Sequence, residues 1–229
     1  MARFTRMQIL NSMYETGVVP IFFHADLDTS IKIVEACAAG GAKVVEMTNR
    51  GDNAWELFSA MVKHFAKADP SVALGGGTIL EPATAALYIN CGANFIVAPN
   101  FNPEVARICN RRKVAYVPGC GSSSEISNAE EMGSEFIKVF PANSVGGPDF
   151  FVAMLGPNSW SSLMPTGTSV EYSQENVNAW FKAGAVGLGA GPALINNALI
   201  SAADYAGITT RCRNMIEWVK QAKAAYPRK

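Results

Sequence analysis

The sequence predicts a single α/β domain over residues 1–229, built as a (β/α)8 (TIM) barrel with an N-terminal helix. Eight short apolar runs alternate with helix-like segments over roughly 200 residues. No linker or change of composition interrupts them. Polar residues and glycines follow the runs instead of preceding them, as expected where the carboxyl ends of parallel strands meet at the mouth of a barrel. A doubly wound open sheet is the alternative, although the GxGxxG pattern that often accompanies it is missing.

Each predicted element follows from its local pattern. Residues 1–17 resemble a short amphipathic helix and lack the apolar core and cleavage site of a signal peptide. Segments between the apolar runs, such as 29–41 and 82–92, show helical spacing and end in glycine, a common stop signal. Residues 183–203 carry no charge, but their glycines and asparagines favour a buried strand, a turn and a helix over a membrane span. The predicted strands are residues 18–23, 43–48, 72–76, 95–99, 114–118, 136–140, 161–165 and 185–189.

Composition argues against several classes of partner. Lysine plus arginine and aspartate plus glutamate each number 19, so no basic excess favours binding to nucleic acid. The cysteines never show CxxC spacing, which argues against a zinc ribbon and a disulfide framework and fits a reducing compartment. We therefore expect a cytoplasmic protein with a small-molecule substrate and no nucleic-acid or membrane partner.

Lys138 is the most informative residue because it lies inside an apolar strand, FIKVF. Side chains alternate across a strand, so Phe136 and Phe140 share the face of Lys138. If Ile137 and Val139 pack under the helices, Lys138 points into the barrel. Desolvation lowers the pKa of an amine from its ordinary value of about 10.4, and the neutral amine can attack a ketone to form a Schiff base. The alternative is a lysine that extends from a strand edge to water.

Glu46 and Arg50 are the charged residues expected beside this lysine. In VVEMTNR, Glu46 faces the same way as Val44 and Thr48. A carboxylate beside a Schiff-base lysine would move protons as water is added and expelled, whereas the alternative is a structural ion pair. Arg50 has the fork geometry that binds a substrate carboxylate, and its alternative interpretation is a solvated loop residue.

Glycine-rich strand ends predict further parts of the site. GGGT at residues 75–78 lies where the third strand meets its helix, and its glycines would allow positive φ angles and close approach of a ligand. PTG at residues 165–167 and GAGP at residues 189–192 follow the seventh and eighth strands, where barrels often bind phosphate. Neither sequence is a Walker motif.

The histidines and serines give weaker signals. His24 ends the first strand at the expected mouth, where it either contacts substrate or has no such role, and His64 is expected on a helix surface. Two histidines without neighbouring carboxylates make a catalytic metal site unexpected. The serines at residues 122–124 are interpreted as a helix cap that leads into Glu125, and not as a nucleophile.

Together these motifs resemble the 2-keto-3-deoxy-6-phosphogluconate (KDPG) aldolase / 4-hydroxy-2-oxoglutarate (KHG) aldolase family. VVEMTNR is similar to its E-V-T-x-R strand, GGGTIL to its G-A-G-T-V turn and FIKVFPA to its F-K-x-F-P-A strand, and YVPG and MPTG match in order and spacing. The resemblance covers roughly residues 18–194. It implies a homotrimeric class I aldolase that cleaves a 2-keto-4-hydroxy acid, such as KDPG or KHG, to pyruvate plus glyceraldehyde 3-phosphate or glyoxylate. The family requires no metal or organic cofactor.

The resemblance also implies roles for individual residues. Lys138 would form the Schiff base and Glu46 would shuttle protons. Arg50 and Thr78 would hold the pyruvyl carboxylate, and Phe140 would pack against the pyruvyl methyl group. The other residues expected to bind substrate are Gly77, Pro118, Gly119, Thr166, Gly167, Thr168, Gly189, Gly191 and His24.

The chain departs from the family at its phosphate-binding loops. The family usually reads P-T-G-G after the seventh strand and G-S after the eighth, whereas here Thr168 follows Gly167 and Pro192 follows Gly191. Thr168 adds a Cβ where the backbone would approach a phosphate, and Pro192 removes a hydroxyl and an N–H donor. We expect weak discrimination for the 6-phosphate, or preference for an unphosphorylated or differently placed acidic group.

Two other functions stay open from the residues alone. A barrel isomerase or epimerase acting on a phosphosugar would use acid and base residues without needing a buried lysine. A non-catalytic barrel that binds a sugar acid would keep the fold without turnover, which the intact Lys138 and Glu46 argue against.

Overall fold

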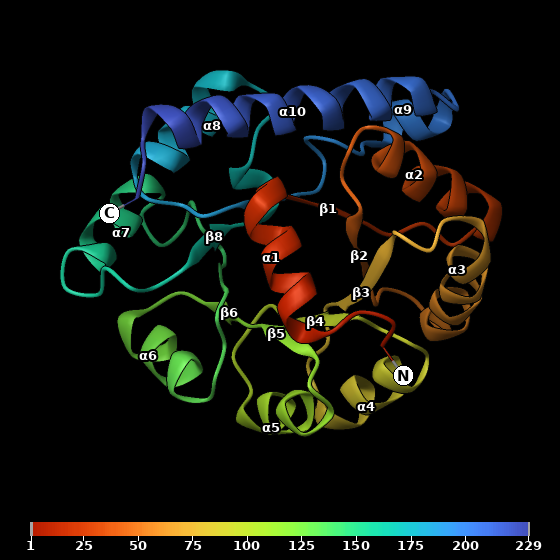
Figure 1. Ribbon diagram of the computed structural model, residues 1–229, viewed down its shortest axis with the longest axis horizontal. Helices are drawn as coiled ribbons and strands as arrows, with labels where there is room; N and C mark the ends of the chain where they lie inside the picture. The colour runs from red at the N-terminus through yellow and green to blue at the C-terminus, as the bar shows by residue number, and fades with distance from the viewer. Residues whose placement is uncertain (1, 229) are drawn as a thin grey trace.

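Strands and helices alternate along residues 2–228, the part of the chain described by the computed structural model (Figure 1). The strands are β1 (Val18–Phe22), β2 (Val44–Thr48), β3 (Ala73–Gly77), β4 (Phe95–Val97), β5 (Ala115–Val117), β6 (Gly119–Cys120), β7 (Ile137–Val139), β8 (Leu163–Pro165) and β9 (Leu188–Ala190). The helices are α1 (Arg6–Thr16), α2 (Leu27–Ala39), α3 (Ala54–Ala68), α4 (Pro82–Asn90), α5 (Pro103–Arg112), α6 (Ser123–Glu131), α7 (Pro148–Leu155), α8 (Gln174–Lys182), α9 (Asn197–Ser201) and α10 (Tyr205–Ala225). Every predicted strand overlaps an observed one.

The strands form two parallel sheets that together make a barrel. One sheet has the order β5-β4-β3-β2-β1-β9 and the other β6-β7-β8. A parallel bridge between Thr166 and Gly189 joins the end of β8 to β9. On the other side, β6 continues the line of β5 beyond Pro118, which has no N–H to donate to a ladder. The predicted (β/α)8 barrel is confirmed, with its fifth strand interrupted at Pro118.

Two apolar clusters separate the inside of the barrel from the layer under the helices. Phe136 belongs to the inner cluster together with Ile9 of α1. Ile137 and Val139 belong to the cluster between strands and helices. Because these neighbours face outward, Lys138 points into the barrel, as the alternation along the strand predicts.

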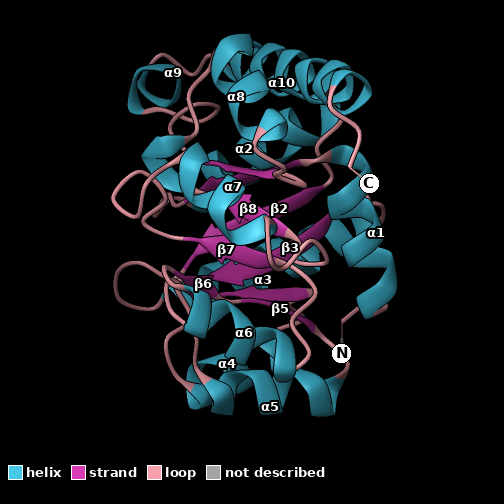
Figure 2. Cartoon of the chain, turned by 90° about the vertical axis from the view of Figure 1, so that its left-hand side faces the viewer, coloured by secondary structure: helices cyan, strands magenta, loops and turns pink. Residues whose placement is uncertain are grey.

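α1 closes the amino-terminal end of the barrel. It begins after Thr5, which forms a capping box with Gln8, and ends at Gly17, whose φ of 66° suits a glycine. In Figure 1 α1 crosses the centre of the ring of helices, and Figure 2 shows it at the end opposite the loops that follow the strands. Its buried side chains are Ile9, Leu10 and Met13. Ligands therefore reach the barrel interior from the carboxyl ends of the strands, called the mouth below.

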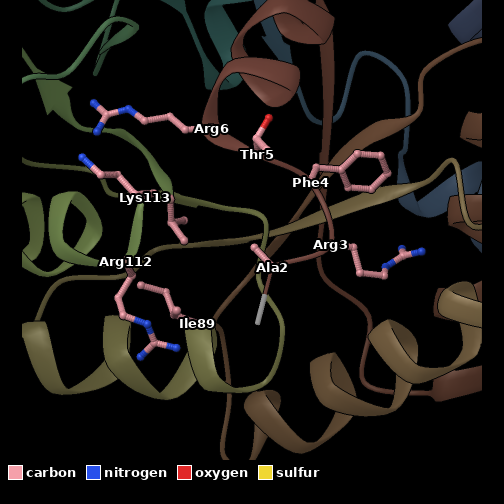
Figure 3. A pocket seen from close by; sticks show the side chains of 9 residues that line it. Ala2, Arg3, Phe4, Thr5, Arg6, Ile89, Arg112 and Lys113 are labelled. Carbon is pink, nitrogen blue, oxygen red and sulfur yellow. The ribbon is translucent and has the colours of Figure 1, made fainter.

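A pocket of about 250 Å³ lies beside the start of α1, and its three arginines already bond other groups of the chain (Figure 3). Arg3 donates to the carbonyls of Pro70 at 3.2 Å and Val72 at 2.6 Å. Arg6 pairs with Glu135 at 2.7 Å, and Arg112 donates to Asn90. In Figure 3 these arginines point in different directions, so they fasten this end of the fold instead of converging on one point. No helix in the described part of the chain is long and apolar enough to cross a membrane.

Candidate active site

Lys138 occupies the centre of β7 and is buried, with 8% of its surface exposed. Its N–H donates to the carbonyl of Pro118 at 2.9 Å, which fixes β7 against β6. Its Nζ lies 5.0 Å from the centroid of the Phe140 ring, which is on the same face of the chain. Burial lowers the pKa of the Lys138 ammonium, the nearby Glu46 carboxylate raises it and the Arg50 cation lowers it. The net shift favours the neutral amine, which is the nucleophilic form.

Glu46 lies at the centre of β2 with no exposed surface. It is paired in register with Ile21 of β1 and Gly75 of β3. Within residues 2–228, neither of its carboxylate oxygens has a hydrogen-bond partner. Burial raises the pKa of the Glu46 carboxyl, against the attraction of the Lys138 and Arg50 cations, which lower it. A carboxyl group with unoccupied oxygens and a raised pKa is suited to gaining and losing protons.

The glycines of the GGGT sequence belong to β3, which reaches one residue beyond the predicted strand end at Gly76, and none of them has the positive φ angle that the sequence was expected to allow. A Cβ on Gly77 would lie 1.9 Å from Oε1 of Glu46, and one on Gly75 would lie 2.4 Å from the Phe95 ring. The glycines therefore make room for side chains packed against the strand. The left-handed residue is the next one, Thr78, with a φ of 59°.

Arg50 follows β2 on a short backbone segment fixed by hydrogen bonds. The N–H of Asn49 donates to the carbonyl of Gly77 at 2.7 Å, and the N–H of Arg50 donates to the carbonyl of Thr48 at 3.0 Å. Arg50 itself is exposed. Its cation lowers the pKa values of both the Glu46 carboxyl and the Lys138 ammonium.

A cleft of about 480 Å³ opens at the mouth and brings several predicted site residues together. Arg50 and Phe140 line it beside the loops that follow β8 and β9. Those loops contribute Gly167, Thr168 and Gly191, as closure of the barrel predicts. The remaining lining residues are Ile21, Phe22, Phe23, Thr48, Pro141, Pro192 and Ile195.

Other predicted site residues lie in the barrel wall instead of lining the cleft. Pro118 and Gly119 are buried beside β7, and a Cβ on Gly119 would lie 2.1 Å from the carbonyl oxygen of Pro99. Thr166 is buried against Gly189, where a Cβ would lie 2.3 Å from the Thr166 methyl group. Close contacts with neighbouring strands explain why glycine occupies positions 119 and 189.

The His24 side chain bonds the backbone of the turn that follows β1. Its Nδ1 accepts the N–H of Asp26 at 3.1 Å, in the turn where Asp26 caps α2. It does not line the cleft, and its substrate contact stays a prediction. His64 lies on α3, partly exposed, 3.8 Å from Glu35. Among the described residues no cluster of three His, Cys, Asp or Glu side chains could hold a metal ion.

Ser122 caps a helix, as predicted. Its side chain accepts the N–H of Glu125 at the start of α6. The carboxylate of Glu125 in turn accepts the N–H of Gly121 at 2.8 Å and the hydroxyl of Ser122 at 3.0 Å. The serine run is therefore explained by capping.

Thr48 is a polar residue of the cleft that the sequence analysis did not predict as part of the site. It is 4% exposed, and its hydroxyl donates to the carbonyl of Phe22 at 3.4 Å. The signal was present in the sequence, because Thr48 shares a strand face with Glu46 and lies one strand period nearer the mouth. The apolar member Ile195 lies in a loop, where no strand or helix period marks it, and Phe23 directly follows β1 although the predicted strand included it.

Comparison with known proteins identifies the family. The family described as KDPG and KHG aldolase matches residues 9–211. The chain belongs to this family. The KHG/KDPG aldolase of Escherichia coli K12 is 29% identical over 210 residues, covering 91% of this chain and 95% of that one. The 2-dehydro-3-deoxy-phosphogluconate aldolase of Treponema pallidum is 31% identical over 159 residues, with coverages of 69% and 74%.

Solved structures of KDPG aldolases share the fold. The enzyme from Legionella pneumophila, with pyruvate captured at low pH as a covalent carbinolamine intermediate, superimposes with a TM-score of 0.81. The two sequences are 24% identical, and the superposition covers 91% of this chain and 98% of the Legionella pneumophila chain. The barrel described above is thus the fold of KDPG aldolases.

Proposed function

We propose that this protein is a class I aldolase that cleaves a 2-keto-4-hydroxy acid to pyruvate and an aldehyde through a Schiff base on Lys138. The observation that carries the proposal is the burial of the Lys138 amine beside Glu46, whose carboxylate oxygens have no partner in residues 2–228. An ordinary structural ion pair would satisfy these oxygens. Membership of an aldolase family, and the captured pyruvate carbinolamine in the Legionella pneumophila enzyme, support the same reading.

The proposed reaction uses only groups of this chain and substrate. The neutral amine of Lys138 attacks the C2 carbonyl carbon, and the carbinolamine loses water to give a protonated imine. Glu46 takes the proton of the C4 hydroxyl as the C3–C4 bond breaks, and the bonding electron pair moves into the imine to form an enamine. The aldehyde leaves, C3 of the enamine is protonated, and hydrolysis releases pyruvate and the free amine.

In this proposal each half of the substrate has a place in the cleft or in the barrel wall below it, where Lys138, Glu46 and Thr78 lie outside the cleft lining. Arg50 and Thr78 hold the pyruvyl carboxylate, and the Phe140 ring packs against the pyruvyl methyl group. The aldehyde half extends toward Thr168 and Pro192, where the cleft is lined by the loops after β8 and β9. The other predicted wall residues, Gly77, Pro118, Gly119, Thr166 and Gly189, shape the space around Lys138.

We also propose that residues 1–229 form one aldolase domain that assembles as a cytoplasmic homotrimer. Val152 and Trp160 are 60% and 71% exposed, as expected for apolar side chains covered in an assembly. The five cysteines are all free, which suits a reducing compartment. Sedimentation of the purified protein measures the oligomeric state.

Trapping with pyruvate and borohydride tests the proposed function. Reduction of the imine should leave a stable adduct, and peptide mapping should locate it at Lys138. An isomerase or epimerase would give no adduct. A non-catalytic sugar-acid barrel would give no pyruvate from KDPG, its unphosphorylated form or KHG, which a coupled assay measures.

A further inference from the structure

A buried tyrosine of α4 is bonded to the loop that carries Arg50. The hydroxyl of Tyr88 donates to the side-chain oxygen of Asn49 at 3.0 Å. Asn49 immediately precedes Arg50. Tyr88 is 1% exposed and does not line the cleft. The bond therefore connects the layer of helices to the edge of the site.

The Tyr88 ring is held on both sides. A Cβ on Gly76 of β3 would lie 2.4 Å from Cδ1 of Tyr88, so the ring rests directly on the backbone of that strand. The Phe58 ring of α3 packs on it at 4.9 Å between centroids, tilted by 44°. Figure 1 shows α3 and α4 as neighbours outside the barrel. A ring clamped in this way holds its hydroxyl in one place.

Asn49 receives this fixed hydroxyl while its own N–H donates to Gly77 at 2.7 Å. Both groups of Asn49 are thus tied to elements other than its own strand. Beyond Arg50 the chain turns through Gly51, with a φ of 82°, and Asn53, with a φ of 58°. The loop that carries Arg50 is therefore held in place at Asn49, the residue before Arg50.

We propose that Tyr88 is a positioning residue that sets the place of the Arg50 guanidinium through Asn49. The inference rests on the proposed function, in which Arg50 binds the pyruvyl carboxylate. Tyr88 touches neither substrate nor Lys138. Loss of its hydroxyl leaves the chemistry at Lys138 intact and weakens the hold on the carboxylate.

The test measures trapping of pyruvate by borohydride as a function of pyruvate concentration. Tyr88→Phe keeps the clamped ring and should raise the half-saturating pyruvate concentration about three- to tenfold, the effect of one hydrogen bond. The maximal trapping rate should stay within about twofold. Tyr116→Phe is the matched control, because Tyr116 is 2% exposed and its hydroxyl bonds Asn100 and Asn102 instead of the Arg50 loop. It should leave the half-saturating concentration unchanged.

A double-mutant cycle separates positioning from a general structural effect. In an Arg50→Met background, Tyr88→Phe should cause no further rise in half-saturating pyruvate. The same rise in both backgrounds, or none in the wild-type background, would overturn the inference. Asn49→Leu removes the acceptor of the same hydrogen bond and should cause the same rise in half-saturating pyruvate concentration as Tyr88→Phe. It serves as the second variant if Tyr88→Phe folds poorly. Absence of any pyruvate adduct in the wild-type protein overturns the proposed function and this inference together, whereas an adduct with unchanged half-saturation overturns only this inference.

Discussion

The carboxylate of Glu46 occupies the space that a side chain at position 77 would need. A Cβ on Gly77 would lie 1.9 Å from Oε1 of Glu46 and 2.6 Å from its carboxyl carbon. Glu46 lies in the middle of β2 and Gly77 at the end of β3, and the two strands are held in register, with Thr48 opposite Gly77. Neither backbone can move aside without breaking the ladder, so the carboxylate itself must shift.

Gly77→Ala should therefore displace Glu46 and lower kcat by about tenfold or more, with about 1–3 kcal/mol lost from the free energy of unfolding through overpacking. Pyruvate release and chemical denaturation measure the two effects. Gly156→Ala is the control, because the nearest atom to its Cβ would be the carbonyl oxygen of Ala153 at 3.6 Å. Full activity in Gly77→Ala would mean that the position of the Glu46 carboxylate does not matter.

Lys138→Ala should abolish pyruvate release and borohydride trapping without unfolding the barrel. Burial of the amine costs free energy of folding. Its removal should therefore not lower the free energy of unfolding by much. Lys223 is the contrasting lysine, since burial also lowers its pKa, but its Nζ donates to the carbonyl of Tyr14 at the end of α1. Lys223→Ala should lower the melting temperature and keep the activity of the folded protein. Turnover retained in Lys138→Ala would exclude the Schiff-base mechanism.

Glu46→Gln should slow pyruvate release by roughly 10²–10⁴-fold, the usual range for loss of a general acid or base. The amide keeps the shape of the side chain and cannot exchange the proton. Pyruvate should still bind, as its half-saturating concentration in the trapping experiment would report. A loss smaller than about tenfold would make Glu46 a structural partner of Lys138.

Substitutions of the two charged neighbours should move the pKa of Lys138 in opposite directions. The trapping rate rises with pH as the ammonium loses its proton, and its midpoint reports that pKa. The Glu46 carboxylate raises the pKa, so Glu46→Gln should shift the midpoint to lower pH. The Arg50 cation lowers it, so Arg50→Met should shift the midpoint to higher pH. Midpoints that move in the same direction would contradict this electrostatic arrangement.

The wild-type protein should prefer the 6-phosphorylated acid over its unphosphorylated form by less than about 10³-fold in kcat/KM. Thr168 and Pro192 line the cleft where an aldehyde-half phosphate would lie. The double variant Thr168→Gly/Pro192→Ser should raise this ratio about tenfold or more by restoring hydrogen bonds to a charged group. Its kcat/KM for the unphosphorylated acid is the internal control. A wild-type preference above the threshold would mean that the present loops already bind the phosphate well.

Local pattern predicts the main features of the fold and the identities of its central groups. The inward direction of Lys138 follows from strand alternation, and the meeting of Thr168 with Pro192 follows from closure of the barrel. The packing role of the glycines in β3 could not be predicted, because a glycine-rich strand end is equally typical of a site where a ligand approaches the backbone. The side chains that need this space, Phe95 and Tyr88, belong to later elements of the fold, and no local period marks their contact with the glycines. Pairs such as Asn49 and Tyr88, separated by 39 residues, leave no periodic signal.

Closure of the amino-terminal end of the barrel by α1 has a consequence for the order in which substrates bind and products leave. In a site that opens on one side, the molecule that enters first lies deepest and leaves last. In the proposed reaction pyruvate stays bonded to Lys138 while the aldehyde lies on the side of the mouth, opposite the end that α1 closes. The aldehyde must depart first, and in the synthetic direction pyruvate must enter first. The kinetic sequence thus follows from the covalent bond to Lys138, and closure of the far end of the barrel by α1 directs both products to the mouth.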